Sequence, residues 1–216
     1  MSVSGFLFLF ILVLNIAMAA FGYIIEIGDY DLDAELQKIN NDPKKFQISL
    51  VLALIEHGSI IALAIMLFIA FSPYNIILGI VWTTFRIGEG LIKFYNEKNY
   101  LGLLNIAKQY SVTSGVEKNS LSDLARTILK TKDSRFTFAM ILWSIGTLTY
   151  SIVLVTYGVV PPIIGWLGIV TSILVFFLNG IKLVKPDFKV FKVLLAIGGL
   201  LAILFEVIIG GWLIFY

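Results

Sequence analysis

Long apolar stretches dominate the hydrophobic pattern of this chain. A transmembrane helix needs about 20 mostly apolar residues, because each residue adds about 1.5 Å and the hydrocarbon core is about 30 Å thick. Runs of this length occur near residues 5–25, 46–71, 74–95, 136–157, 160–181 and 193–215. The pattern predicts an all-α fold: a polytopic bundle of six transmembrane helices that forms one membrane domain over residues 1–216.

The loop between the third and fourth runs, residues 96–135, is predicted to be helical as well. Its apolar side chains recur at the three- and four-residue spacing of amphipathic helices. The two stripes are Tyr100, Leu103, Leu104, Ala107 and Tyr110, and then Leu121, Leu124, Ala125, Ile128 and Leu129, behind a capping-box pattern of Ser120 and Asp123. We expect one or two amphipathic interfacial helices. They either lie on the anionic inner leaflet or cap the bundle, because periodicity does not distinguish lipid from protein as the apolar partner.

Composition supports a membrane protein and excludes several kinds of chemistry. The chain is 59% hydrophobic and 14% charged, whereas an average soluble domain is about 25% charged. Cysteine is absent, which excludes disulfides, thiolate nucleophiles, iron–sulfur clusters and cysteine-ligated zinc. The net charge of +2 gives no indication of a nucleic-acid partner.

The basic residues predict how the chain is oriented in the membrane. With six spans, both termini lie on one side, and 15 of the 16 Lys and Arg residues lie toward the other. The positive-inside rule therefore makes loops 26–45, 96–135 and 182–192 cytoplasmic and places both termini outside. These residues are Lys38, Lys44 and Lys45; Lys93, Lys98, Lys108, Lys118, Arg126, Lys130, Lys132 and Arg135; and Lys182, Lys185, Lys189 and Lys192.

Five ionisable residues well inside the predicted spans form the candidate ligand-binding site. They are Glu56, His57, Arg86, Glu89 and Glu206. A charge at the middle of the bilayer costs at least about 2.5–3.5 kcal/mol, so such residues face the bundle interior and find partners. Counted from the turn near Pro73, Glu56, His57 and Glu89 lie at nearly one depth. Arg86 lies one turn away on the same face as Glu89, and Glu206 is roughly level with Arg86.

Two interpretations of these residues stay open. In the structural interpretation, Arg86 bridges Glu89 with Glu56 or Glu206 and fixes the helix register, while His57 donates to a carbonyl. In the functional interpretation, Arg86 grips an anionic group such as a carboxylate or a lipid phosphate in a water-accessible pocket. Three carboxylates against one arginine leave one acid without a fixed cation, which favours a proton, a metal ion, a cationic ligand or a neutral carboxyl.

Other polar and aromatic residues in the spans have ordinary structural explanations. Ser144, Thr147 and Ser151 form a stripe that either packs against a neighbouring helix or lines a polar cavity. The four tryptophans, Trp82, Trp143, Trp166 and Trp212, are expected to be anchors in lipid or at the membrane interface.

No catalytic residue, metal ligand or cofactor is predicted. A single histidine builds neither a His-x-x-x-His pair nor a three-histidine zinc site, and no serine-hydrolase motif is present.

Several short motifs resemble a family of six-helix bacterial and archaeal membrane proteins known as domain of unknown function 4386. The motifs are Asn40-Asn41 followed by Phe46, the R-x-x-E of Arg86 and Glu89, the turn Val159-Val160-Pro161-Pro162 followed by Gly165 and Gly168, and the stretch from Glu206 to Trp212. One position departs from the family, since relatives have a basic residue where this chain has Pro162 and Ile163. The resemblance implies the fold but no activity.

Three functions are compatible with the sequence. The preferred hypothesis is a non-enzymatic binder or carrier of a small ion, metabolite or lipid headgroup at the buried Arg/Glu/His cluster. The alternatives are a structural or regulatory membrane subunit in which the charges hold helices together, and an intramembrane enzyme. The lipid bilayer is the expected partner, and a membrane-protein partner or a homo-oligomer stays open.

Overall fold

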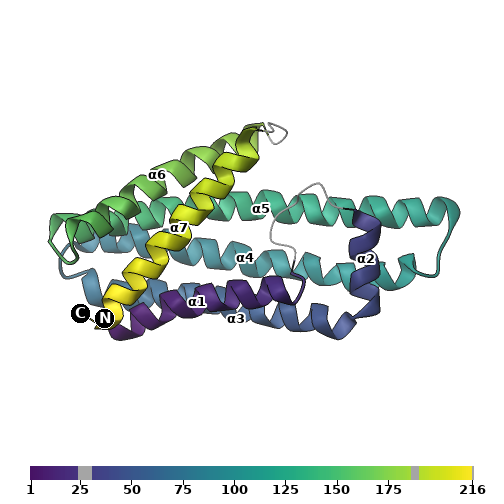
Figure 1. The fold of residues 1–216 in the computed structure, drawn as a ribbon, viewed down its shortest axis with the longest axis horizontal. Helices are drawn as coiled ribbons and strands as arrows, with labels where there is room; N and C mark the ends of the chain where they lie inside the picture. The colour runs from purple at the N-terminus through teal and green to yellow at the C-terminus, as the bar shows by residue number, and fades with distance from the viewer. Residues whose placement is uncertain (24–30, 186–189, 216) are drawn as a thin grey trace.

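The structure, a computed structural model, describes residues 1–23, 31–185 and 190–215. All regular elements in these ranges are helices, which confirms the predicted all-α class. α1, α3, α4 and α5 run along the long axis, α6 and α7 are inclined to it, and α2 crosses it near the end away from the two termini (Figure 1). The helices are α1 Ser2–Ala20, α2 Leu32–Asn41, α3 Pro43–Phe71, α4 Ile76–Tyr110, α5 Gly115–Thr156, α6 Pro162–Val184 and α7 Val190–Phe215.

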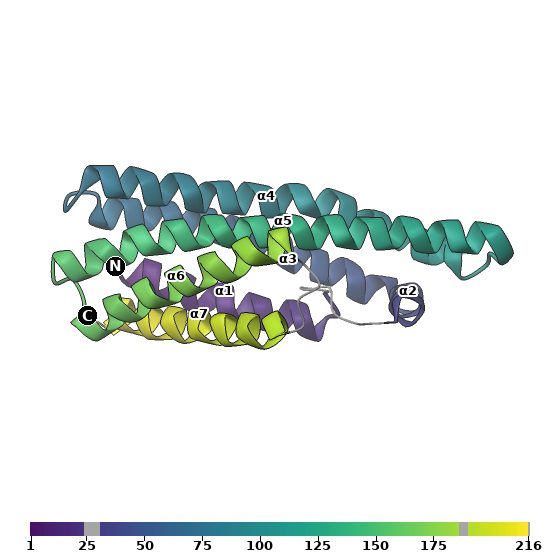
Figure 2. The ribbon, with the colours of Figure 1, turned by 90° about the horizontal axis from the view of Figure 1, so that it is seen from above.

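The long helices pack in a closed ring. Each contacts the next in the order α1, α3, α4, α5, α6 and α7, and α7 returns to α1. The views in Figures 1 and 2 both place α1 beside α7. Glycine makes this closure possible, because a Cβ atom at Gly5 would lie only 2.6 Å from the backbone oxygen of Gly210. The long helices therefore surround a common interior.

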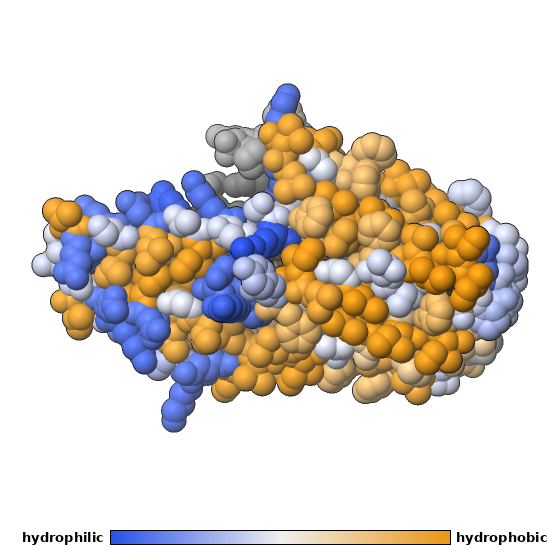
Figure 3. Space-filling view, turned by 180° about the vertical axis from the view of Figure 1, so that it is seen from behind, coloured by the Kyte–Doolittle hydropathy of each residue, from blue (hydrophilic) through white to orange (hydrophobic). Residues whose placement is uncertain are grey.

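The outer surface of the ring is apolar. Five helical segments are long and apolar enough to cross a membrane: α1, α3, α5, α6 and residues Val193–Phe215 of α7. Figure 3 shows a broad apolar surface over most of the molecule, with hydrophilic side chains gathered toward the end that carries α2. Because lipid accepts apolar side chains that water would not, the chain is a multipass membrane protein in contact with the bilayer.

The predicted span 74–95 forms the first part of α4. This helix is not among the five apolar segments, because Arg86, Glu89 and Lys93 all fall within its first 18 residues. α4 nevertheless packs between α3 and α5 in the ring.

The predicted loop 26–45 contains the short helix α2, which the apolar pattern did not reveal. Asp31 caps this helix by accepting hydrogen bonds from the backbone N–H groups of Asp33 and Ala34. Asp42 then caps α3 in the same way through the N–H of Lys45. Residues 24–30 and 186–189 lie outside the described residues, and with them the end of the predicted first span and parts of loops 26–45 and 182–192.

The amphipathic segments of loop 96–135 are helical, but they are not separate interfacial helices in the described chain. α4 continues unbroken to Tyr110 and α5 starts at Gly115, so both extend beyond the ring as an antiparallel pair. Ser120 lies inside α5 and donates to the carbonyl of Val116 instead of capping a helix. The apolar stripes are buried mainly against each other, α2 and α3, although Leu124 is exposed. Their main apolar partner is therefore protein.

Candidate functional site

The predicted site residues all lie in the ring, but they divide into two groups. Glu56, His57, Arg86 and Glu89 are buried, and Glu206 on α7 is half-buried. Arg86 belongs to both groups, since it forms an ion pair along α4 and also lines a cavity at the centre of the ring.

The first group begins as a row of ion pairs along α4. Arg86 Nη1 lies 2.7 Å from Glu89 Oε2, and Lys93 Nζ lies 3.0 Å from Glu89 Oε1. Lys93 Nζ also lies 3.6 Å from Glu56 Oε1 and so joins α4 to α3. Residues three or four positions apart share one face of a helix, which is why these side chains meet. Lys93 supplies the second cation that the predicted site lacked.

The row continues on α3 and returns to α4. Glu56 Oε2 is paired with His57 Nδ1, and His57 Nε2 lies 3.3 Å from Glu97 Oε1. The expectation that His57 donates to a carbonyl is wrong, because its ring lies between two carboxylates. Asn15 Nδ2 of α1 adds a contact of 3.4 Å to Glu56 Oε1. We call Arg86, Glu89, Lys93, Glu56, His57 and Glu97 the charge ladder.

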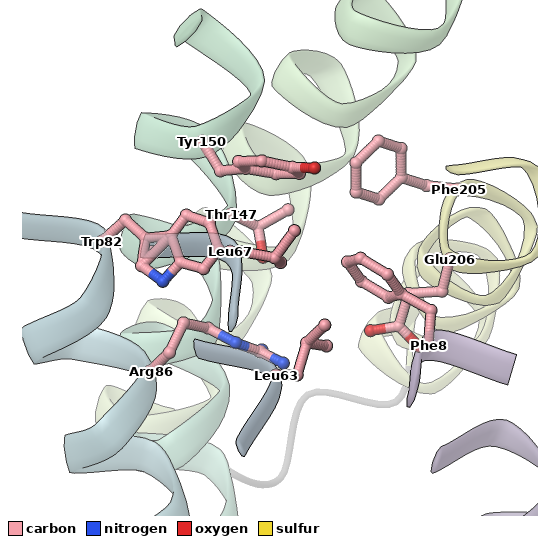
Figure 4. Close-up of a pocket in the computed structure, with 10 residues that line it drawn as sticks. Phe8, Leu63, Leu67, Trp82, Arg86, Thr147, Tyr150, Phe205 and Glu206 are labelled. Atoms are coloured by element: carbon pink, nitrogen blue, oxygen red, sulfur yellow. The ribbon is translucent and has the colours of Figure 1, made fainter. Parts of the chain in front are cut away.

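The second group lines a cavity that we call the Arg86–Glu206 cavity. Figure 4 shows the two side chains pointing toward one another from opposite walls. The cavity offers about 20 Å³ to the centres of water molecules, which is room for about one water. Its walls come from α1, α3, α4, α5 and α7: Phe8, Leu63, Leu67, Trp82, Arg86, Gly146, Thr147, Tyr150, Phe205 and Glu206.

Two polar atoms on the walls of this cavity have no hydrogen-bond partner among the described residues: Trp82 Nε1 and Tyr150 Oη. The two rings meet edge to face, with centroids 4.7 Å apart. Glu206 is held differently from the other acids, because its Oε1 accepts a hydrogen bond of 3.1 Å from Trp143 Nε1. The side chains around the cavity thus include a guanidinium, a carboxylate and two aromatic groups whose buried donors have no partner among the described residues.

Two of the predicted tryptophan anchors occupy the protein interior instead. Trp82 and Trp143 are each only 4% exposed, whereas Trp166 is 56% exposed and fits the expectation. An indole N–H can donate a hydrogen bond in a buried polar site as well as at a membrane interface, so tryptophan is compatible with both positions.

The three residues of the hydroxyl stripe of α5 lie in different surroundings. Thr147 lines the cavity. Ser144 donates to the carbonyl of Met140 within the helix. Ser151 packs against α6, where a Cβ atom at Gly168 would lie 2.2 Å from its Oγ.

Lys93 and Glu97 were not among the predicted site residues. Lys93 lies close to the end of the apolar run 74–95, so it was counted with the basic residues of the following loop. Helix periodicity would have identified both residues, since positions 86, 89, 93 and 97 follow one face of a continuous helix. No group of three or more His, Asp or Glu side chains in the described part of the chain is placed to hold a metal ion.

Comparison with known proteins identifies a family and no characterised relative. Neither a curated protein nor a solved structure matches the chain. A family description, Domain of unknown function (DUF4386), matches residues 3–216. The match covers nearly all of the sequence, and the chain therefore belongs to the DUF4386 family.

Proposed function

We propose that this protein is a non-enzymatic binder or carrier of a small anionic group, such as the carboxylate or phosphate of a metabolite or lipid. The Arg86–Glu206 cavity is the binding position. The whole chain, 1–216, acts as one membrane domain of six spans, with the first part of α4 as the sixth.

The two unpartnered donors carry this proposal. A buried donor without an acceptor costs about 1–3 kcal/mol, and buried polar groups in folded proteins normally have partners. Trp82 Nε1 and Tyr150 Oη both lack one among the described residues, and both side chains line the same cavity as Arg86. Two unpartnered donors on side chains that surround one space favour a hydrogen-bond acceptor beside them.

Arg86 supplies the charge for an anionic acceptor. Its Nη1 is engaged with Glu89, and a guanidinium has five N–H donors in a fixed fork, so further donors can face a ligand. An Arg–anion pair in a water-poor interior is stronger than the same pair at a surface. Because the cavity has room for about one water, the ligand presents a single small group and displaces that water.

The charge ladder supports a structural role for the other predicted site residues. Glu56, His57, Glu89 and Lys93 already pair with one another and join α3 to α4. Removing one member of such a buried pair costs about 3–5 kcal/mol, because it leaves its partner uncompensated. The hypothesis that the charges hold helices together therefore applies to the ladder, and the binding hypothesis applies to the cavity.

Native mass spectrometry of the purified protein tests the binding proposal. The wild type is expected to carry a small bound mass that is lost in Arg86→Gln and reduced in Tyr150→Phe. Tyr74→Phe is the matched control, because Tyr74 is exposed near the turn between α3 and α4, away from the cavity. A wild type without any bound mass, or one whose mass survives both cavity substitutions, would contradict the proposal.

A further inference from the structure

A surface pocket opens beside the end of α1, and one of its lining residues, Tyr23, contacts the charge ladder. It holds about 500 Å³ of space for water, far more than the central cavity. Its walls come from the segment after α1, which includes Tyr23, from α2 and from the start of α3. Tyr23 is the important residue, since its hydroxyl reaches from this pocket toward the buried acids.

A continuous row of hydrogen bonds starts at Tyr23. Its hydroxyl donates to Glu97 Oε1, and the same oxygen lies 3.3 Å from His57 Nε2. The other ring nitrogen, Nδ1, is paired with Glu56 Oε2. The Tyr23 hydroxyl, the His57 ring and the carboxyl groups of Glu97 and Glu56 can each give and take a proton. Because Tyr23 lines the surface pocket, the row connects this pocket to the buried end of the ladder.

The charges around His57 favour a protonated ring. Two carboxylates face it, Glu56 from its own helix and Glu97 from α4, and one ammonium, that of Lys93 on α4, lies beyond Glu56. The ring edge packs against Phe94. On the α5 side, Lys132 Nζ lies over the ring of Tyr23, at 3.7 Å from its centroid. The nearest charges to the imidazole are thus negative.

Glu97 is suited to carry a proton in transit. Its Oε1 is engaged by both Tyr23 and His57, while its buried Oε2 has no hydrogen-bond partner in the part of the chain that the structure describes. Because both neighbours share Oε1, a proton that Tyr23 gives to this oxygen is already within hydrogen-bond reach of His57 Nε2.

We propose that His57 is a proton-binding site that exchanges with water through Tyr23 and Glu97. In the inward direction, Tyr23 takes a proton from a hydronium ion in the pocket as it gives its own proton to the Glu97 carboxylate. The Glu97 carboxyl then passes that proton to His57 Nε2. The products are water, neutral Tyr23, the Glu97 carboxylate and a His57 imidazolium held by Glu56, and release is the reverse sequence. This function stands whether or not the central cavity binds an anion.

The composition of the chain makes a direct test possible. His57 is the single histidine, so protein labelled with ¹⁵N in the histidine ring gives NMR signals from this residue alone. The full chain in lipid nanodiscs is used to measure how fast the ring N–H groups exchange with water. Wild type is compared with Tyr23→Phe and Glu97→Gln, and with Tyr74→Phe, which removes a hydroxyl at an exposed position away from the row.

Exchange is expected in the wild type and in Tyr74→Phe. In Tyr23→Phe it is expected to slow by roughly tenfold or more, because losing one link of the row raises the barrier by about the free energy of a buried hydrogen bond. Glu97→Gln keeps an acceptor for Tyr23 but cannot carry a proton, so exchange slows there too. A wild-type rate in either variant, or a wild-type ring that does not exchange, would overturn the proposal.

Discussion

Glu206 differs from the other buried acids because a tryptophan, and not a cation, holds its carboxylate. Trp143 Nε1 donates to Glu206 Oε1, and the side chain lines the central cavity across from Arg86. Its negative charge therefore competes with any anion for the guanidinium. At the level of single residues, the cavity contains both the group that attracts an anion and one that limits how tightly it binds.

The substitution Glu206→Gln tests whether the negative charge of Glu206 weakens anion binding at Arg86. Glutamine keeps an oxygen that can accept the hydrogen bond from Trp143, but it removes the negative charge. We expect the variant to retain its bound mass, with occupancy several-fold higher than in wild type, as measured by native mass spectrometry at matched concentrations. Loss of the bound mass would show that Glu206 itself binds a cationic ligand, which contradicts the proposed anion site.

Several of these residues could be predicted from the sequence because charges in an apolar run stand out. Glu56, His57, Arg86, Glu89 and Glu206 were identified in this way; the first four are buried, and Glu206 lines the central cavity. Their pairing could not be predicted, because it depends on Lys93 and Glu97, which lie where the apolar run ends but the helix continues. Nor could the sequence show that Trp82 and Tyr150 lack partners, since this depends on how five helices surround one space.

α2 is attached to the extended end of α4 by a hydrogen bond in addition to apolar packing. The Tyr110 hydroxyl donates to Asp33 Oδ1. This contact raises the pKa of Tyr110 from 10.0 to about 12, because the carboxylate stabilises the neutral hydroxyl. A group whose pKa is raised on folding contributes stability below its unfolded pKa and loses that contribution as the pH passes its folded pKa. The contact is therefore complete below about pH 10 and is lost as the pH rises through about 12.

A spin label at Gln37→Cys, on the exposed face of α2, measures this attachment. In the protein that carries only the Gln37→Cys substitution, label mobility is expected to stay low at pH 8 and to rise between about pH 10 and 12. In Tyr110→Phe, mobility is expected to be raised already at pH 8. Equal mobility of the two proteins across this pH range would mean that the hydrogen bond does not hold α2.

The element boundaries could be predicted only in part. Apolar length identified the five helical segments that are long and apolar enough to cross a membrane, and the amphipathic stripes correctly indicated helix at 96–135. Helical periodicity does not show where one helix ends and another begins, so the continuity of α4 and α5 through the predicted loop was not foreseen. α2 was missed because it has only 10 residues, too few for an apolar run, and its start depends on the capping side chain of Asp31.

At the scale of the whole molecule, the two ends of the ring differ in charge. Both termini lie at one end, and the helical extension of α4 and α5 lies at the other (Figure 1). The positive-inside rule favours a cytoplasmic position for the extension, which is the orientation that we propose. In this orientation the surface pocket at Tyr23 takes its protons from the cytoplasmic side.

Cysteine labelling tests the orientation, because the chain has no cysteine of its own. We expect a membrane-impermeant maleimide to label Ser2→Cys in intact cells. Ser114→Cys, at the tip between α4 and α5, is expected to react only after the cells are permeabilised. The reverse pattern would establish the opposite orientation.

The central claim is that the buried polar residues divide into a ladder that stabilises the bundle and a cavity that binds a ligand. Thermal unfolding of Lys93→Met and Tyr150→Phe, measured together in the same detergent, tests this division most directly. Lys93→Met leaves Glu56 and Glu89 without their shared cation, and we expect it to cost about 3–5 kcal/mol. Tyr150→Phe removes a hydroxyl that has no partner among the described residues, and its stability is expected to equal or exceed that of wild type. A Tyr150→Phe protein that is as unstable as Lys93→Met would contradict the division.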